Sequence, residues 1–415
     1  MNNDPLVESL VLRQVDRINE ANIYFLKSIG DSIKKIKQLT PSEAQQLVQI
    51  LKYGGNYDNI VREISKYTNM NVNEINEIFE RYASVDQAFY KQFYQYRDIP
   101  FVKYSENEVL KRQTLALADI TKNEMTNFTR STAIGYTITD PRDGKVKFMG
   151  LRSVYERLLD DALLGVSQGK DTFDSTMYRI LKEIAESGLK TELQYASGRH
   201  MRLDSAIRMH IKDGLRNLHN ENQILFGKEF GSDGVEISVH GHPAPDHAMV
   251  QGHQFYNDEF NKFQNDEDAV DVNGVLFEAE YDGHDRRSIS QYNCYHYVFS
   301  IIVGSSKPVY TPEQLQAIID DNNKGFDYEG KHYTKYEGEQ LLRNIELELR
   351  KSKDAQILGR ASDNNELISK SQDRITKLTR KYHEVLQESG LPNRLKRARV
   401  SGYRRVNVDD VSKSV

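Results

Sequence analysis

One cysteine and no tryptophan occur in the 415 residues of the chain. A single cysteine excludes an internal disulfide framework, so folding does not depend on an oxidising compartment. No apolar run approaches the roughly 18 residues that a membrane-spanning helix needs, and the opening residues MNNDPLVESL lack the continuous apolar core of a secretory signal. We therefore expect a soluble protein that is made in a cytoplasm and has no membrane partner.

Several motifs that identify enzymes are also missing. The sequence has no glycine-rich phosphate loop, no Ser/His/Asp arrangement in a recognisable context and no zinc-finger spacing. It contains neither an internal repeat nor a low-complexity linker. These absences argue against nucleotide-dependent enzymes, serine hydrolases and zinc-finger proteins, and they predict no cofactor.

Charge is distributed unevenly along the chain. Residues 231–285 contain 13 Asp and Glu against one Lys, a local net charge of −12 in a chain whose total is −5. The rest of the chain is therefore net basic. Residues 391–415 contain seven Lys and Arg against two Asp, a net of +5, and we expect this basic tail either to contact nucleic acid through phosphates or to lie against an acidic neighbour.

The periodicity of apolar residues predicts an α+β protein that is predominantly α-helical. We expect a helical N-terminal region at 1–130 and a helical region with a short hairpin at 131–234. A small mixed α/β core with most of the histidines should follow at 235–310, then a long helical hairpin at 311–390 and the basic tail at 391–415.

Local signals mark the ends of several elements. Thr40 and Thr311 each begin a capping box with proline at the first helical position, and Asn71 with Glu74 predicts another helix start. Residues 137–149 alternate around a Pro-Arg-Asp-Gly turn and predict a hairpin. Strands are expected at 235–239, 275–279 and 297–303, the last fully buried. In the final helix, Leu367, Ile368, Ile375, Leu378, Tyr382, Val385 and Leu386 should face its neighbour.

The histidine-rich centre is the candidate functional site. Six of the 11 histidines and the single cysteine lie between residues 235 and 303. His240, His247, Cys294 and His296 could supply the four nitrogen and sulfur ligands of a tetrahedral zinc site. Their spacing is not a standard one and there is no second cysteine, so the pattern favours histidines that hold loops to the small sheet through hydrogen bonds, with zinc as the alternative.

Two enzyme hypotheses remain as alternatives. A metal-dependent hydrolase would use Asp246 as a further ligand or general base, although no residue is identified as a nucleophile. Glu278 and Glu280 form the Glu-x-Glu pair used by arginine-directed ADP-ribosyltransferases, but the Ser-x-Ser strand that should precede the pair is absent.

Seven segments with a recognisable order span about residues 185–399. They are Ser187-Gly188, SGRHMRLD, ISVHGHPAPDHAMVQG, NCYH, SKPVYTPEQL, YEGKHYTKYEGEQLLRNIELELRKSK and SGLPNRLKRARV. This ordered set resembles the phage minor capsid protein 2 family of tailed phages of Gram-positive bacteria, and the N-terminal 130 residues match less clearly. The resemblance places His240, His247, Gln251, Gly252, Cys294 and His296 at characteristic central positions. Val250 and Tyr295 depart from it, standing where the family tends to have tryptophan and arginine.

The resemblance implies a structural virion protein and not an enzyme. It implies a few-copy component of the phage head, at the portal vertex or inside the capsid, with roles in assembly, DNA packaging or delivery. Its implied partners are the portal and major capsid proteins, and packaged DNA through the basic tail. The protein would be made in the cytoplasm of the bacterial host and would end in the virion.

Overall fold

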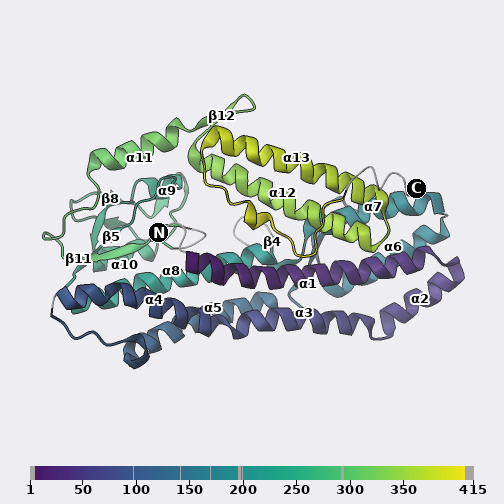
Figure 1. Ribbon diagram of the computed structural model, residues 1–415, viewed down its shortest axis with the longest axis horizontal. Helices are drawn as coiled ribbons and strands as arrows, with labels where there is room; N and C mark the ends of the chain where they lie inside the picture. The colour runs from purple at the N-terminus through teal and green to yellow at the C-terminus, as the bar shows by residue number, and fades with distance from the viewer. Residues whose placement is uncertain are drawn as a thin grey trace. The chain divides into compact units, whose positions relative to one another are not determined.

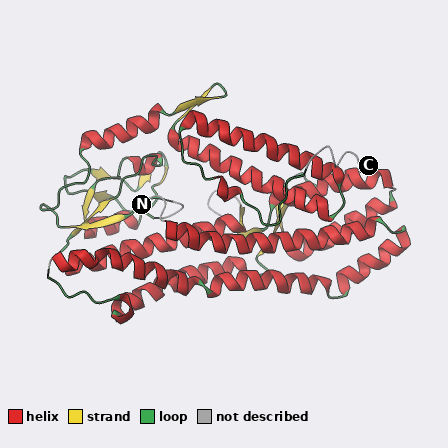
Figure 2. Cartoon of the chain, viewed as in Figure 1, coloured by secondary structure: helices red, strands yellow, loops and turns green. Residues whose placement is uncertain are grey.

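The structure is a computed structural model that describes residues 5–96, 98–140, 142–168, 170–194, 198, 200–290 and 294–406. Across these residues the protein is mostly helical, with short antiparallel strands (Figure 2). The expected fold class is confirmed. None of the helices described is long and apolar enough to cross a membrane.

The chain forms two compact units, and each unit is built from three separate segments. Unit 1 comprises Met1–Val11, Glu74–Asn123 and Met209–Glu339, and unit 2 comprises Leu12–Asn73, Glu124–Arg208 and Gln340–Val415. The five regions expected along the sequence stay a prediction.

The helices and strands are named in chain order (Figure 1). The helices are α1 (Pro5–Lys37), α2 (Pro41–Tyr53), α3 (Asn56–Asn73), α4 (Ile75–Tyr96), η1 (Tyr104–Glu106), α5 (Glu108–Thr129), α6 (Leu151–Ser167), α7 (Lys170–Ser187), α8 (Leu203–Glu229), α9 (Pro245–Ala248), α10 (Asn257–Gln264), α11 (Pro312–Lys324), α12 (Lys335–Ala361), α13 (Asn365–Ser389) and η2 (Leu395–Ala398). The strands are β1 (Ile134–Thr139), β2 (Val146–Gly150), β3 (Lys190–Gln194), β4 (His200–Arg202), β5 (Gly234–Ile237), β6 (Gln254–Tyr256), β7 (Ala269–Val270), β8 (Leu276–Phe277), β9 (Glu280–Tyr281), β10 (His284–Asp285), β11 (Val298–Ile301), β12 (Phe326–Tyr328) and β13 (Lys331–Tyr333).

Helices α4, α5 and α8 pack together in unit 1. Tyr90 of α4 lies against Phe226 of α8, with ring centroids 4.8 Å apart. Gly214 of α8 allows close packing, because a Cβ there would overlap Thr121 of α5. His219 of α8 is buried and bonds Asp86 of α4 at 2.9 Å.

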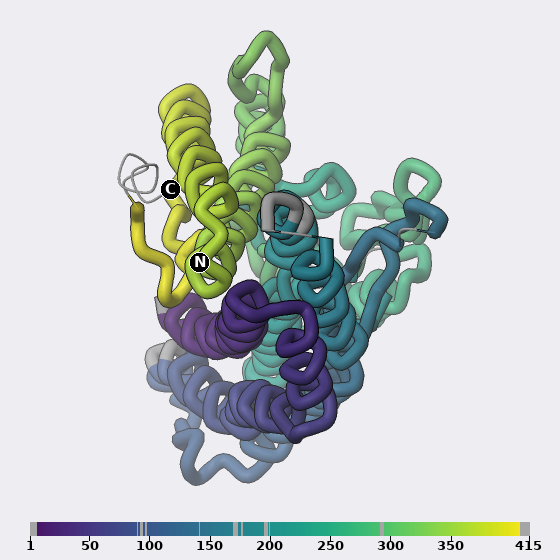
Figure 3. Tube along the Cα trace, turned by 90° about the vertical axis from the view of Figure 1, so that its right-hand side faces the viewer, coloured from purple at the N-terminus to yellow at the C-terminus, as the bar shows by residue number. Residues whose placement is uncertain are grey.

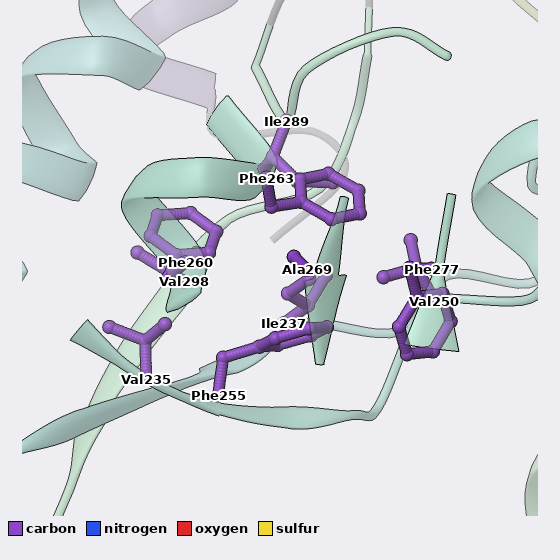
Figure 4. Close-up of a cluster of buried hydrophobic side chains, with 10 residues drawn as sticks. All are labelled: Val235, Ile237, Val250, Phe255, Phe260, Phe263, Ala269, Phe277, Ile289 and Val298. Atoms are coloured by element: carbon purple, nitrogen blue, oxygen red, sulfur yellow. The ribbon is translucent and has the colours of Figure 1, made fainter. Parts of the chain in front are cut away.

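A three-stranded antiparallel sheet of order β11-β5-β6 joins α8 to the histidine-rich centre. Asn220 of α8 accepts a hydrogen bond from the backbone of Val298 at 3.1 Å, which fixes β11 to the helix. Phe299 and Ser300 of β11 are only half-buried, so the expectation of a fully buried strand is wrong. The core beside this sheet is apolar and contains several phenylalanines (Figure 4): Val235, Ile237, Val250, Phe255, Phe260, Phe263, Ala269, Phe277, Ile289 and Val298.

Unit 2 contains a four-stranded sheet of order β2-β1-β3-β4. The hairpin expected at 137–149 is confirmed as β1 and β2, which pair in antiparallel register. Tyr136 of β1 is fully buried, stacks on Phe25 of α1 and donates a hydrogen bond to Asn22 at 2.9 Å. The tyrosine therefore buries its ring while satisfying its hydroxyl.

The long C-terminal helices form the expected antiparallel pair, α12 and α13, which lie side by side in Figures 1 and 3. Gln356 of α12 donates to Gln372 of α13 at 2.9 Å, and Tyr382 of α13 donates to Glu346 of α12 at 3.1 Å. The helix α13 ends at Gly390, whose left-handed backbone is the conformation that glycine favours at a helix end.

The described part of the basic tail, 391–406, belongs to unit 2 and packs against α12. Arg350 and Lys353 of α12 donate hydrogen bonds to the backbone carbonyls of Arg397 and Ala398. Val400 is buried with Ile23 and Ile357. Residues 407–415, which complete the expected tail, lie outside the described residues.

Some local expectations are wrong. Asn71 does not cap a helix: it lies within α3, is buried, and donates to the backbone carbonyl of Gln14 at 3.0 Å. The next helix begins at Ile75. The strand expected at 275–279 is limited to Leu276–Phe277. Of the seven α13 residues expected to face the neighbouring helix, five are buried, and Leu378 and Leu386 are half-buried. Both predicted capping boxes are confirmed.

Candidate functional site

The candidate site lies in unit 1, where the connection between β5 and β6 meets the segment that leads into β11. Backbone hydrogen bonds hold these two segments together, because Ser238 donates from its N–H to the carbonyl of Tyr297 at 2.7 Å. The hydroxyl of Ser238 accepts from the N–H of Tyr297 at 2.8 Å. The short helix α9, which has Pro245 at its first position, presents His247 toward the same segment.

His247, Cys294 and His296 form a compact group, called here the His/Cys cluster. The Sγ of Cys294 lies 3.3 Å from Nδ1 of His247 and 3.4 Å from Nδ1 of His296. All three donor atoms lie within 4.8 Å of one another, and all three residues are at most 4% exposed. The structure thus brings together three of the four residues that the zinc alternative named as ligands.

His240 lies beside the cluster and is not one of its members. Its ring is 4.3 Å from that of His296, centroid to centroid, and its Nδ1 accepts from the backbone N–H of His242 at 3.4 Å. His242 in turn contacts the carboxylate of Glu339 through Nδ1 at 3.1 Å. These contacts are of the kind expected for histidines that hold loops in place.

The outer nitrogens of the cluster face carbonyl oxygens. Nε2 of His247 lies 2.8 Å from the backbone carbonyl of Arg287, and Nε2 of His296 lies 3.3 Å from the side-chain oxygen of Gln251. That oxygen also accepts the backbone N–H of His240 at 3.2 Å. The side-chain nitrogen of Gln251 is buried and has no hydrogen-bond partner among the described residues.

Arg287 connects the cluster to Asp246. Its guanidinium binds the Asp246 carboxylate through two hydrogen bonds, of 2.7 and 2.5 Å. Burial raises the pKa of Asp246, but the hydrogen bond from Arg287 and the nearby charges outweigh it and hold the pKa below its ordinary value. Asp246 is therefore engaged by Arg287, which does not fit the role of free general base or metal ligand considered from the sequence.

The three histidines differ in the direction in which their pKa values are shifted. Loss of solvation lowers the pKa of His240 to about 4 and places that of His296 well below its ordinary value, so both are neutral at pH 7. For His247, burial is outweighed by Cys294, and the pKa is raised. For the Cys294 thiol, burial raises the pKa, but the hydrogen bond with His247 and the charge of that ring lower it by more, so the pKa is below its ordinary value.

This arrangement favours ligand or hydrogen-bond chemistry over nucleophilic catalysis. A cysteine beside a histidine is a common nucleophilic pair, but the Cys294 side chain is 4% exposed and a macromolecular substrate could not approach it without rearrangement. Glu278 and Glu280 are exposed, and Glu280 lies in the two-stranded β9-β10 sheet. No described contact joins either glutamate to the cluster.

Sequence reasoning missed two residues of the site. The backbone carbonyl of Arg287 contacts His247, and its guanidinium binds Asp246. Glu339, near the start of α12, contacts His242. The backbone carbonyl of Arg287 carries no sequence signal. Glu339 lies in the segment YEGKHYTKYEGEQLLRNIELELRKSK of the family resemblance, but nothing in the sequence indicates that it meets His242. Asn293 of the Asn-Cys-Tyr-His segment lies outside the described residues.

The comparisons with known proteins identify the family. No curated protein and no solved structure matches the chain. The family model described as phage minor capsid protein 2 matches residues 4–387. The match includes the N-terminal helices, so it covers more of the N-terminal part than the segments recognised in the sequence. The chain therefore belongs to the phage minor capsid protein 2 family and is a structural component of a phage head.

Proposed function

We propose that this minor capsid protein lies at the portal vertex or on the inner side of the capsid, where it acts in head assembly, DNA packaging or DNA delivery. The observation that carries the proposal is the family match over residues 4–387. The proposed partners of the protein are the portal protein and the major capsid protein.

The histidine-rich centre supports a structural role over the enzyme alternatives. A metal-dependent hydrolase requires a metal that substrate can reach, whereas the His/Cys cluster is buried. An ADP-ribosyltransferase requires its glutamates beside a nucleotide pocket, whereas Glu278 and Glu280 are exposed on short strands and their connection. We infer that the protein is not an enzyme.

The basic tail gives the protein a second proposed partner, packaged DNA. In the described part of the tail, Lys396, Arg399, Arg404 and Arg405 are exposed. Arg350 and Lys353 fix the backbone at Arg397 and Ala398, and the backbone N–H of Val406 donates to the side-chain oxygen of Gln372, so these side chains are displayed from an ordered segment. Such cations can neutralise phosphates without reading the base sequence.

Analysis of purified phage particles tests the location. Mass spectrometry of proheads and mature virions should find the protein in both at far fewer copies than the shell subunit, and crosslinking should join it to the portal protein. Crosslinks only to shell subunits on the outer surface would contradict the proposed location. Absence from both particles would contradict the proposed function altogether.

Salt-dependent binding tests the DNA contact. The variant Arg404→Ala/Arg405→Ala should bind duplex DNA more weakly, and the slope of log K against log salt should fall by about 1.8 if two phosphate contacts are lost. The control is Arg62→Ala/Lys66→Ala, which removes two exposed cations from α3. Equal losses in both variants, or no DNA binding by the wild type, would contradict this role of the tail.

A further inference from the structure

The two histidines of the His/Cys cluster present the same ring atom to one sulfur. Nδ1 of His247 and Nδ1 of His296 lie 3.3 and 3.4 Å from the Sγ of Cys294. They approach from separate parts of the chain, His247 from α9 and His296 from the segment before β11. The sulfur is therefore bracketed by two imidazole nitrogens inside the protein.

The hydrogen bonds on the far sides of the rings identify the tautomers. A carbonyl oxygen can only accept, so Nε2 of His247 must carry the proton that it donates to Arg287. The oxygen of Gln251 is fixed in place because it accepts the N–H of His240. Nε2 of His296, which faces that oxygen, must therefore also be the protonated nitrogen. In the neutral rings, both Nδ1 atoms then direct a lone pair at the sulfur.

Hydrogen bonding alone cannot satisfy this arrangement. Cys294 and the two Nδ1 atoms share one proton, and whether it lies on the sulfur or on Nδ1 of His247, at least one Nδ1 lone pair faces the sulfur without a donor. The backbone N–H of His296 also points to Sγ at 3.4 Å, which uses the sulfur as an acceptor. A buried acceptor without a donor costs about 1–3 kcal/mol. Three converging lone pairs are instead the electronic arrangement of a metal site.

We propose that Cys294 Sγ and the Nδ1 atoms of His247 and His296 bind one divalent transition-metal ion, with zinc as the first candidate. Zinc at about 2.0–2.1 Å from nitrogen and 2.3 Å from sulfur separates tetrahedral ligands by about 3.5 Å. The two S···N distances of 3.3 and 3.4 Å need to change by only tenths of an ångström. Binding replaces the thiol proton, which is released to solvent.

The surroundings match the support that metal-binding histidines usually have. Such histidines donate their other N–H to a carbonyl or carboxylate, which orients the ring, and the carbonyls of Arg287 and Gln251 occupy those positions. Gln251 is thus a positioning residue, 1% exposed. His240 stands outside the group of converging donor atoms, so the proposed ligands from the protein are three.

The proposed ion would connect two parts of unit 1. It would join α9 to the segment that enters β11, and β11 pairs with the central strand β5. Because the ligands are buried, the ion would stabilise the fold and would not take part in a reaction. This inference is independent of the location proposed in the phage head.

Metal analysis of the full-length wild type gives the first test. The protein should be expressed without a polyhistidine tag, stripped with a chelator and titrated with zinc, after which elemental analysis should find about one zinc per chain. The Cys294 thiol should react slowly with a thiol reagent when zinc is present and faster after stripping. No metal above background, or thiol reactivity independent of zinc, would overturn the proposal, and neither readout requires a variant to fold.

Cobalt substitution of variants identifies the ligands. Cobalt in the wild type should produce a thiolate-to-metal charge-transfer band, which Cys294→Ser should abolish and His247→Ala should weaken or abolish. The matched control is His284→Ala, because His284 is an exposed histidine of the same unit. A band that persists in Cys294→Ser, or a loss of metal in His284→Ala equal to that in His247→Ala, would overturn the assignment.

Discussion

The guanidinium of Arg202 occupies the space beside Gly188 that a side chain at residue 188 would need. A Cβ at Gly188 would overlap Nη1 of Arg202, and the backbone of Gly188 has φ = +63°, a conformation that glycine adopts readily. Gly188 follows the last residue of α7, and Arg202 ends β4. The residue that ends the helix therefore also makes room for a buried charge in unit 2.

Gly188→Ala should destabilise the protein for two reasons. The left-handed backbone costs a non-glycine residue about 1–2 kcal/mol, and overlap with Arg202 adds about 1–3 kcal/mol. Gly390→Ala is the matched control, because Gly390 ends α13 with φ = +64° and a Cβ there would meet nothing within 4 Å. Denaturant unfolding should show the larger loss for Gly188→Ala, and equal losses would mean that Arg202 moves aside without cost.

Arg202 is the centre of a buried ionic network. It donates to Asp354 at 2.9 Å and lies 3.4 Å from Asp204, which also pairs with Arg350 at 3.3 Å. Burial raises the pKa of Asp354, with Arg202 opposing the shift, whereas the arginines around Asp204 outweigh burial and lower its pKa. Removal of Arg202 would leave Asp354 buried without its main counter-charge.

Arg202→Met should therefore lower the free energy of unfolding by about 3–5 kcal/mol. Adding Asp354→Leu should recover much of the loss, because two apolar side chains can replace a buried ion pair at little cost. A double-mutant cycle by denaturant unfolding measures the coupling between the two residues. Additive losses would show that the two charges do not depend on each other.

The final helix offers a test of which face is buried. Ile375 of α13 is 5% exposed, whereas Leu378 is half-buried. Ile375→Asp should cost several kcal/mol by burying a charge without a partner, and Leu378→Asp should cost less because its carboxylate can reach water. Thermal unfolding of the two variants compares them directly, and a larger loss for Leu378→Asp would contradict the packing described here.

The sequence predicted local structure where a short stretch contains the whole signal. The capping boxes at Thr40 and Thr311 depend on residues within one helical turn, and both formed. Asn71 carries the same kind of signal, but its amide bonds the carbonyl of Gln14 from a distant helix, and α3 continues through it. Tertiary contacts of this kind are not encoded in local spacing.

In the candidate site, too, residue types could be predicted from the sequence and tertiary contacts could not. His247, Cys294 and His296 were selected because they are rare residue types in one stretch, and the fold brings their donor atoms together. His240 has the same residue type but its ring nitrogen accepts from His242 instead. Which histidine joins the cluster depends on loop geometry, and the supporting oxygen of Arg287 belongs to the backbone, so residue identity could not reveal either.

Lys190 predicts an unusual dependence of stability on pH. Burial, followed by the charges of Arg202 and Lys351, lowers its pKa from 10.5 to about 8. Between these pH values the unfolded chain binds more protons than the folded protein, so the contribution of Lys190 to the free energy of unfolding rises with pH. When the pH is lowered from 10.5 to about 8, this contribution decreases. Below about pH 8 the folded protein carries the buried Lys190 charge, which is destabilising.

Lys190→Met should consequently stabilise the protein at pH 7 and remove the rise in stability between about pH 8 and 10.5. The pKa shift corresponds to about 3 kcal/mol, which solvent screening of this half-buried side chain reduces to about 1–2 kcal/mol. Loss of the hydrogen bond from Lys190 to the carbonyl of His200 offsets part of the gain. Lys182→Met is the control, because the Lys182 side chain is 41% exposed and pairs with Glu186 at 3.2 Å. This variant should change stability by less than about 0.5 kcal/mol. Denaturant unfolding across this pH range measures both variants. A stability difference between the wild type and Lys190→Met that does not change with pH above about 8 would contradict the lowered pKa.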